Sequence, residues 1–174
     1  MTQQARQHWV QTQLDRLEGP LLRYARRLLH GDLESARDVV QDAFLKLCRQ
    51  PMDGLAGRER EWLYTVVRNQ AIDHLRKERR MQPTDQQALA QTQDRQRAPE
   101  ADLQAADRKA LIDQQLQTLS ERDREVIRLK YQDGLSYAAI AGITGLSVSH
   151  VGVVLHHAIR RLRSGLAPHE GSLS

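Results

Sequence analysis

The sequence predicts an all-α fold of two small helical domains joined by a polar linker. Hydrophobic residues make up 40% of its 174 residues but aromatic residues only 4%, a mixture that suits packed helices better than a β-sandwich. Apolar residues recur at helical spacing, and no useful length of chain alternates as a strand would. Residues 81–106 hold seven Gln, two Pro and a net charge of −2, which indicates the linker.

The first predicted domain covers residues 5–80. Gly19-Pro20 interrupts its opening helical pattern, and proline suits the first turn of a new helix. Gly31-Asp32 ends that helix and offers a cap for a helix over residues 33–49. QPMDGLAG breaks the pattern again before a long helix over residues 59–80. The apolar residues expected to pack inward are Leu14, Leu17, Leu21, Leu22, Ala25, Leu28, Leu29, Ala36, Val39, Val40, Ala43, Phe44, Leu47, Leu63, Val66, Val67, Ala71, Ile72 and Leu75.

The second predicted domain covers residues 107–166. Leu111, Leu116 and Leu119 precede Ser120, which with Asp123 three residues later resembles a capping pair. The next helix stops at Asp133-Gly134. Tyr137 to His156 then has the pattern of a helix-turn-helix. This motif needs a small residue where its two helices pack closely, a turn residue that tolerates unusual dihedrals, and apolar residues that hold the second helix at its angle. The residues in these positions are Ala141, Gly145, Leu146, Val151 and Val154. The alternative is an αα-hairpin that merely packs.

The predicted helix-turn-helix contains no Lys or Arg, so positive charge must come from elsewhere. Residues 107–166 carry nine basic and six acidic residues, and we expect phosphate contacts from the flanks of the motif. The seven basic residues expected to make these contacts are Arg122, Arg124, Arg128, Lys130, Arg160, Arg161 and Arg163. Gly152 inside a helix costs about 0.5–1 kcal/mol relative to Ala. Either close approach to DNA or simple tolerance accounts for it.

Other function classes are disfavoured. Cys48 is the one cysteine, so no internal disulfide forms, and we expect a buried structural thiol. The N-terminus has no apolar signal core, and no run approaches the ~20 apolar residues of a membrane span, so we expect a cytoplasmic protein without membrane insertion. The histidines lie scattered, without a carboxylate at a ligand spacing such as H-E-x-x-H. We therefore expect no cofactor, no metal and no enzyme activity.

Three stretches carry a resemblance that covers nearly the whole chain. ARDVVQDAFLKLCR, EWLYTVVRNQAIDHLRKERR and TLSERDREVIRLKYQDGLSYAAIAGITGLSVSHVGVVLHHAIRRLR occur in the order and spacing of conserved regions. The chain resembles an extracytoplasmic function (ECF) sigma factor of bacterial RNA polymerase. The resemblance implies that domain 5–80 binds core RNA polymerase and the −10 promoter element, and that domain 107–166 binds the −35 element. It also implies an anti-sigma factor as a partner.

The resemblance assigns site residues to three surfaces. The surface for core polymerase comprises Asp38, Gln41, Asp42 and Leu45. The −10 DNA surface comprises Trp62, Arg68, Asn69, Asp73, Arg76, Lys77 and Arg80. The −35 DNA surface comprises Ser136, Tyr137, Ser147, Val148, Ser149, His150, Gly152, His156 and Arg160. Solvated polar faces are the alternative for the first two surfaces, and core packing is the favoured alternative for Trp62.

The sequence departs from the family pattern at two places. Gly152, Val153 and Val154 stand where the recognition helix of the family often carries Lys and Arg. The resemblance offers two candidate surfaces on which the apolar run VGVVL would pack instead: the polymerase flap and an inhibitor. The loop QPMDGLAGRERE lacks the aromatic residue often found before the −10 helix. Two rival functions remain: a stand-alone helix-turn-helix regulator, and a sigma-like protein that only sequesters polymerase.

Overall fold

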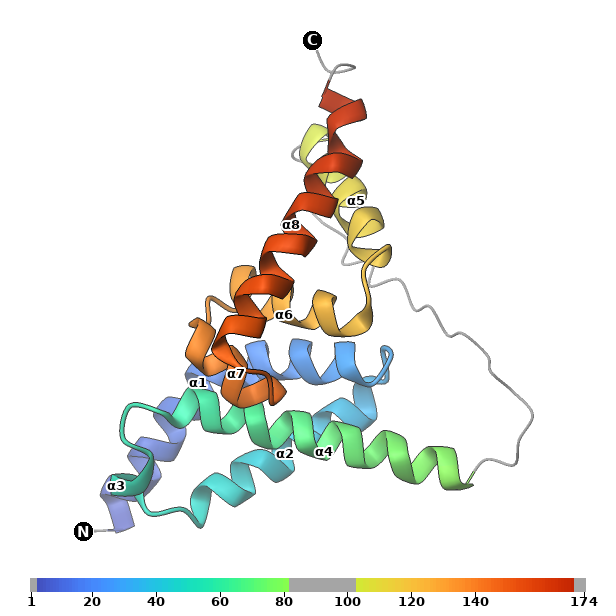
Figure 1. Cartoon of the computed structure of the whole chain (residues 1–174). Helices are drawn as coiled ribbons and strands as arrows, with labels where there is room; N and C mark the ends of the chain where they lie inside the picture. Colours follow the sequence, from blue (N-terminus) through green and yellow to red (C-terminus); the bar gives the residue numbers. More distant parts are fainter. Residues whose placement is uncertain (1–2, 82–102, 171–174) are drawn as a thin grey trace. The chain divides into compact units, whose positions relative to one another are not determined.

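The computed structural model describes residues 3–81 and 103–170, which form eight helices and no strand. The all-α prediction is confirmed. Contacts divide the chain into unit 1, Met1–Asp94, and unit 2, Arg95–Ser174 (Figure 1). Most of the predicted linker, residues 82–102, lies outside the described residues.

Unit 1 is built from three long helices and one short one. They are α1 (Gln3–Leu28), α2 (Leu33–Cys48), α3 (Met52–Leu55) and α4 (Glu59–Met81). Helices α1, α2 and α4 pack against one another in pairs. The rings of Tyr24 and Tyr64 lie 5.1 Å apart between their centroids inside this core. The other buried hydrophobic residues of the unit are Leu17, Leu21, Ala25, Leu29, Ala36, Val39, Val40, Ala43, Phe44, Leu47, Leu55, Leu63, Val67 and Ala71.

Most of the residues expected to pack inward are therefore buried, and six are only half-buried. The six are Leu14, Leu22, Leu28, Val66, Ile72 and Leu75. They flank the buried stripes of α1 and α4, because a helix that packs on one side leaves the margins of its apolar face partly exposed.

The predicted helix break at Gly19-Pro20 is wrong, because α1 runs through Pro20. A proline inside a helix removes one backbone hydrogen bond and usually bends the helix. Figure 1 shows α1 changing direction along its length. The buried Leu17, Leu21 and Tyr24 lie on both sides of Pro20, so packing on α2 and α4 holds the helix together across it.

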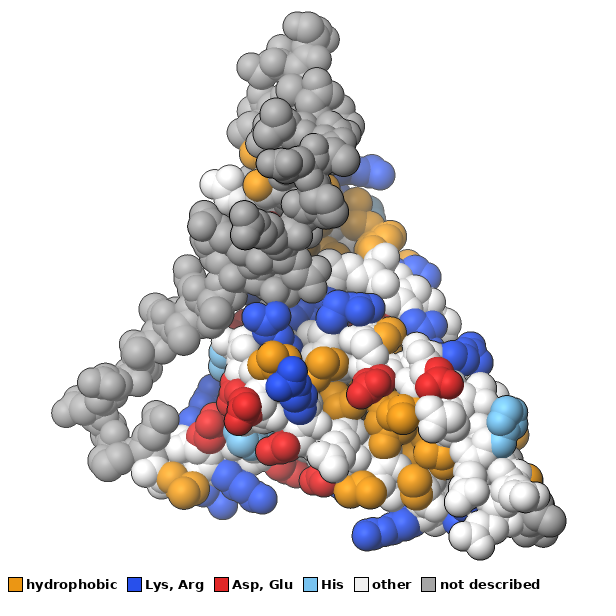
Figure 2. Space-filling view, turned by 180° about the vertical axis from the view of Figure 1, so that it is seen from behind, with side chains coloured by type: hydrophobic (Ala, Val, Ile, Leu, Met, Phe, Trp, Pro, Cys, Tyr) orange, Lys and Arg blue, Asp and Glu red, His pale blue; other side chains and the backbone are white. Residues whose placement is uncertain are grey.

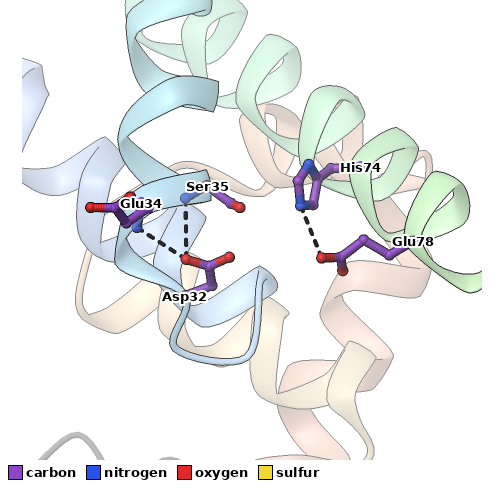
Figure 3. Close-up of polar contacts among 5 residues, drawn as sticks. All are labelled: Asp32, Glu34, Ser35, His74 and Glu78. Carbon is purple, nitrogen blue, oxygen red and sulfur yellow. Dashed lines mark hydrogen bonds and ion pairs between the residues drawn. The ribbon is translucent and has the colours of Figure 1, made fainter. Parts of the chain in front are cut away.

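The predicted cap between α1 and α2 is confirmed. His30 and Gly31 have positive φ values of 54° and 97° and end α1. Asp32 then caps α2: its Oδ1 accepts from the backbone N–H groups of Glu34 at 3.0 Å and Ser35 at 3.2 Å (Figure 3). Hydrogen bonding from Ser35, first from its side chain and then from its amide, lowers the pKa of Asp32 below its ordinary value of 3.8.

Cys48 is exposed, so the prediction of a buried thiol is wrong. The buried face of α2 ends at Leu47, one residue earlier, and the next residue of a helix lies about 100° further round. Cys48 therefore continues the exposed stripe of Gln41 and Leu45. Its carbonyl oxygen accepts from Arg6 Nη1 at 3.0 Å, which attaches the start of α1 to the end of α2.

Unit 2 contains α5 (Leu103–Gln117), α6 (Glu121–Tyr131), α7 (Tyr137–Thr144) and α8 (Val148–Glu170). Helix α8 packs against the other three. The predicted cap at Ser120 is confirmed, because its Oγ accepts from the Asp123 N–H at 3.1 Å. The buried hydrophobic residues are Leu116, Leu119, Val126, Ile127, Leu129, Leu135, Ala139, Ile140, Ala141, Ile143, Leu146, Val151, Val154, Leu155 and Ala158.

Within the described residues, no single helix is long and apolar enough to cross a membrane. The pair Tyr137–Thr144 and Val148–Ser164 reaches that length and hydropathy only when the two helices are taken together, and they are bent by 102°.

Candidate nucleic-acid and protein-binding surfaces

Helices α7 and α8 form a helix-turn-helix, as predicted. Gly145 ends α7 in the left-handed conformation with φ 72°, and its N–H donates to the Ala141 carbonyl at 2.9 Å. A residue with a Cβ is strained in this conformation, which explains a glycine at the turn. Leu146, Val151 and Val154 are buried and hold α8 against the unit. The bend of 102° between the two helices lies in the range of known helix-turn-helix motifs.

The exposed face of α8 carries most of the residues assigned to −35 DNA. Val148, Ser149, His150, His156 and Arg160 are all exposed. Ser147, just before the helix, accepts from the His150 N–H through its Oγ at 3.2 Å. This bond uses the hydroxyl as a helix cap, so Ser147 helps to start the helix as well as standing at its exposed end.

Tyr137, Lys130 and Gly152 form a small cluster at the start of α7. Ser136 caps this helix, because its Oγ accepts from the Ala139 N–H at 3.1 Å. The Tyr137 ring is 40% exposed, and the Lys130 ammonium lies 5.2 Å from its centroid. A Cβ on Gly152 would lie 3.7 Å from Tyr137 Cε2, which is ordinary contact. The structure therefore leaves room for alanine at residue 152.

Some of the basic residues expected to contact phosphate have structural partners. Arg124 donates through Nε to the Leu116 carbonyl at 3.1 Å and through Nη2 to the carbonyls of Gln117 and Leu119 at 3.2 and 3.1 Å. It thereby satisfies carbonyl groups at the end of α5. Lys130 Nζ donates to the Leu135 carbonyl at 3.4 Å. Exposed basic side chains remain at Arg122, Arg160, Arg161 and Arg163.

The residues assigned to core polymerase lie on the solvent side of α2. Asp38, Gln41, Asp42 and Leu45 are all exposed, and the Leu45 side chain is 50% exposed. The opposite side of α2 is buried against α1 and α4. Figure 2 shows acidic side chains gathered on unit 1 beside exposed hydrophobic ones. An exposed leucine among carboxylates gives a partner both an apolar contact and a charge to match.

The residues assigned to −10 DNA lie along α4. Asn69, Asp73, Arg76, Lys77 and Arg80 are exposed, whereas Trp62 and Arg68 are half-buried. Arg76 Nη1 lies 3.5 Å from Asp73 Oδ1, and both side chains are more than 60% exposed, at 71% and 64%. Such an exposed pair is worth little free energy, so Arg76 can exchange Asp73 for a phosphate at small cost.

Two further side chains of α4 correct a sequence prediction. His74 Nε2 lies 3.3 Å from Glu78 Oε1, one helical turn away. The statement that no histidine has a carboxylate at ligand spacing is therefore wrong for His74, because residues four apart on a helix face each other.

Comparison with known proteins agrees with the division into two units. Residues 14–81 match the family model of Sigma-70 region 2, and residues 109–162 match that of Sigma-70 region 4. The chain is 38% identical over 148 residues to the ECF RNA polymerase sigma factor SigL of Mycobacterium tuberculosis, covering 82% of this chain and 80% of that protein. It is 32% identical over 154 residues to the RNA polymerase sigma factor YlaC of Bacillus subtilis, covering 84% and 85%.

Proposed function

The chain belongs to the ECF sigma factors of RNA polymerase, and from this premise we propose how its two units share promoter recognition. Its function is to act with core RNA polymerase in transcription initiation at promoter DNA. Sigma factors are regulators rather than enzymes, and in this proposal the chain acts beside polymerase in the cytoplasm without catalysing a reaction itself. The division into two separately packed units, each matching one sigma region, carries the proposal.

In unit 1, the exposed stripe of α2 binds core polymerase. Leu45 supplies the apolar centre of the contact, and Asp38 and Asp42 supply charge for basic residues of the partner. The buried side of the helix fixes the stripe in place, because Val40, Phe44 and their neighbours anchor it to the unit 1 core.

The exposed side of α4 binds the −10 element. Asn69 offers both a donor and an acceptor to a base edge, and Arg76 and Lys77 offer positive charge to the phosphates. Unstacking a base costs a few kcal/mol, so several such contacts must act together to hold an extruded base. Trp62 and Arg68 are half-buried. They support α4 and contact DNA only at the edge of this surface.

Unit 2 binds the −35 element through α8. Ser149 and His150 offer hydrogen-bonding groups to base edges, and Val148 offers an apolar contact to a thymine methyl group. Phosphate contacts come from Arg160 and from the N-terminus of α7 at Ser136 and Tyr137, because backbone N–H groups at a helix start attract anions.

We also propose that an anti-sigma protein regulates the chain by covering part of unit 2. Val148 and Val153 are 50% and 53% exposed, and Tyr137 is 40% exposed on the same unit. A protein that packs on these side chains would hide α8 from DNA. Competition between a candidate inhibitor and −35 duplex DNA for the purified chain tests this part, and simultaneous binding of both would refute it.

The main experiment is run-off transcription on pooled fragments of the source genome, with core RNA polymerase in the presence or absence of the purified chain. We expect new discrete transcripts that Asn69→Ala with Arg76→Ala abolishes. Arg23→Ala is the matched control, because it removes an exposed arginine of α1 that belongs to none of the assigned surfaces. Stable binding to core without new transcripts would favour a sequestering protein, and no binding to core would favour a stand-alone DNA-binding regulator.

A further inference from the structure

Three side chains from two helices of unit 1 meet near the start of α2. Asp32 comes from the turn before α2, and His74 and Glu78 come from successive turns of α4 (Figure 3). One ligand atom of each residue lies within 4.8 Å of those of the other two. No residue of this cluster belongs to the surfaces assigned to polymerase or DNA.

The separation of two of these atoms is already that of ligands on one metal ion. His74 Nε2 and Glu78 Oε1 lie 3.3 Å apart. Two atoms that bind a zinc ion at about 2.0–2.2 Å with a tetrahedral angle lie roughly 3.3–3.6 Å from each other. The third atom, within 4.8 Å, must approach by roughly 1 Å, a movement that rotation of the exposed Asp32 or Glu78 side chain provides.

The surroundings orient two of the three groups. The Glu34 and Ser35 N–H groups donate to Oδ1 of Asp32, which keeps this carboxylate at the start of α2, near His74 and Glu78 of α4 (Figure 3). The Nε2 atom of His74 is shielded from solvent and makes no hydrogen bond within the described part of the chain. Its neighbour at 3.3 Å is the Glu78 carboxylate, which attracts it as an ion pair only when the imidazole carries a proton. A metal ion between them would satisfy both groups with a neutral imidazole.

We propose that Asp32, His74 and Glu78 form a binding site for a first-row divalent transition-metal ion, with Zn²⁺ as its test ion. One imidazole nitrogen and two carboxylate oxygens suit such an ion better than the all-oxygen sites of Ca²⁺ or Mg²⁺. Three protein ligands leave a coordination position open to water. The bound ion ties the turn between α1 and α2 to α4, two segments more than 40 residues apart in the sequence, and stabilises unit 1.

The site is tested on the untagged full-length chain, freed of metal by a chelator and titrated with ZnCl₂ in a calorimeter. We expect one equivalent of zinc whose affinity falls at least ~10-fold in His74→Ala and in Glu78→Gln. Glu78 is half-exposed, so its substitution leaves the fold intact. Asp32→Asn removes a ligand charge but keeps a good N-cap, and we expect it to weaken binding by a similar factor. The matched control, His157→Ala, removes an exposed histidine of unit 2. We expect it to bind one equivalent of zinc with the affinity of the wild type.

Thermal unfolding gives a second readout. Both tryptophans, Trp9 and Trp62, lie in unit 1, so their fluorescence reports the unfolding of that unit. Zinc at ten times its Kd is expected to raise the Tm of unit 1 by about 5–10 °C in the wild type and to leave that of His74→Ala unchanged. Equal binding by wild type and His74→Ala, or no binding with zinc up to about 1 mM, would overturn the proposal. Neither assay contains polymerase or DNA, so such a failure leaves the sigma-factor assignment untouched.

Discussion

Replacing Gly152 by alanine should stabilise unit 2. Glycine inside a helix costs about 0.5–1 kcal/mol relative to alanine, because it loses more backbone freedom on folding. The added Cβ would lie 3.7 Å from Tyr137 Cε2, an ordinary contact that requires no rearrangement. The free energy of unfolding of unit 2 should therefore rise by the full difference in helix propensity between glycine and alanine. For a unit of this size it corresponds to a rise in Tm of about 2–8 °C.

Two other glycines of the helix-turn-helix provide matched comparisons. At Gly142, inside α7, an added Cβ meets no atom within 4 Å, so Gly142→Ala should give a similar gain. Gly145 has φ 72°, and Gly145→Ala should lose about 1–2 kcal/mol because alanine is strained in the left-handed region.

Circular dichroism and tryptophan fluorescence together locate these effects in the full chain. Both tryptophans lie in unit 1, so a change in unit 2 should shift the transition seen by circular dichroism and leave the fluorescence transition in place. Loss of stability in Gly152→Ala would refute the reasoning. A more stable Gly152→Ala that no longer supports −35-dependent transcription would show that this position must be glycine for close approach to DNA.

Three further variants test other parts of the structure. Arg124→Ala should cost unit 2 about 1.5–3 kcal/mol in urea unfolding, because it leaves carbonyl groups at the end of α5 without their charged donor, whereas the exposed Arg122→Ala should change stability by less than about 0.5 kcal/mol. Asp32→Ala should cost unit 1 about 1 kcal/mol at neutral pH. Because the pKa of Asp32 is lowered in the folded state, its contribution to stability is present above the unfolded pKa and is lost as the pH falls through the folded pKa. The free energies of unfolding of wild type and Asp32→Ala should therefore become equal in strong acid. Fluorescence-detected unfolding with a chelator present measures this. Leu45→Ala should leave stability unchanged within about 0.5 kcal/mol but weaken binding to core polymerase in a pull-down; equal binding would argue against the α2 surface.

Local features of the sequence predicted much of the fold. The caps at Asp32 and Ser120 and the turn at Gly145 depend on a few adjacent residues, and the structure has all three. Pro20 shows the limit of such rules: its local signal says that a helix starts, but packing of the residues around it on α2 and α4 keeps α1 continuous. The exposed Cys48 was within reach of the sequence, because it lies seven residues after Gln41 on the polar stripe of the same helix.

Contacts that depend on how one helix is placed against another could not be predicted in the same way. Arg124 looked like a free basic residue on a supporting helix, yet it bonds to carbonyl groups in the last turn of α5 and just after it. His74 and Glu78 are recognisable as neighbours from their spacing, but Asp32 joins them only because α2 packs on α4. Spacing within one helix gives a pair of ligands, whereas a third ligand requires the tertiary fold.

The absence of Lys and Arg from Tyr137 to His156 is explained by how the two units act together in the proposed function. Arg124 and Lys130 bond to carbonyl groups of unit 2, so the basic side chains left for phosphate lie mainly after the recognition face of α8, at Arg160, Arg161 and Arg163. Phosphate contacts dominate the affinity of an isolated DNA-binding domain, so we expect unit 2 alone to bind DNA weakly. Once core polymerase holds unit 1 at the promoter, unit 2 meets its element at an effective concentration on the order of millimolar. A −35 contact with a Kd near 100 µM would then be about nine-tenths occupied. Under these conditions α8 needs enough hydrogen bonds to distinguish sequences, and strong phosphate binding of its own would only favour unspecific DNA.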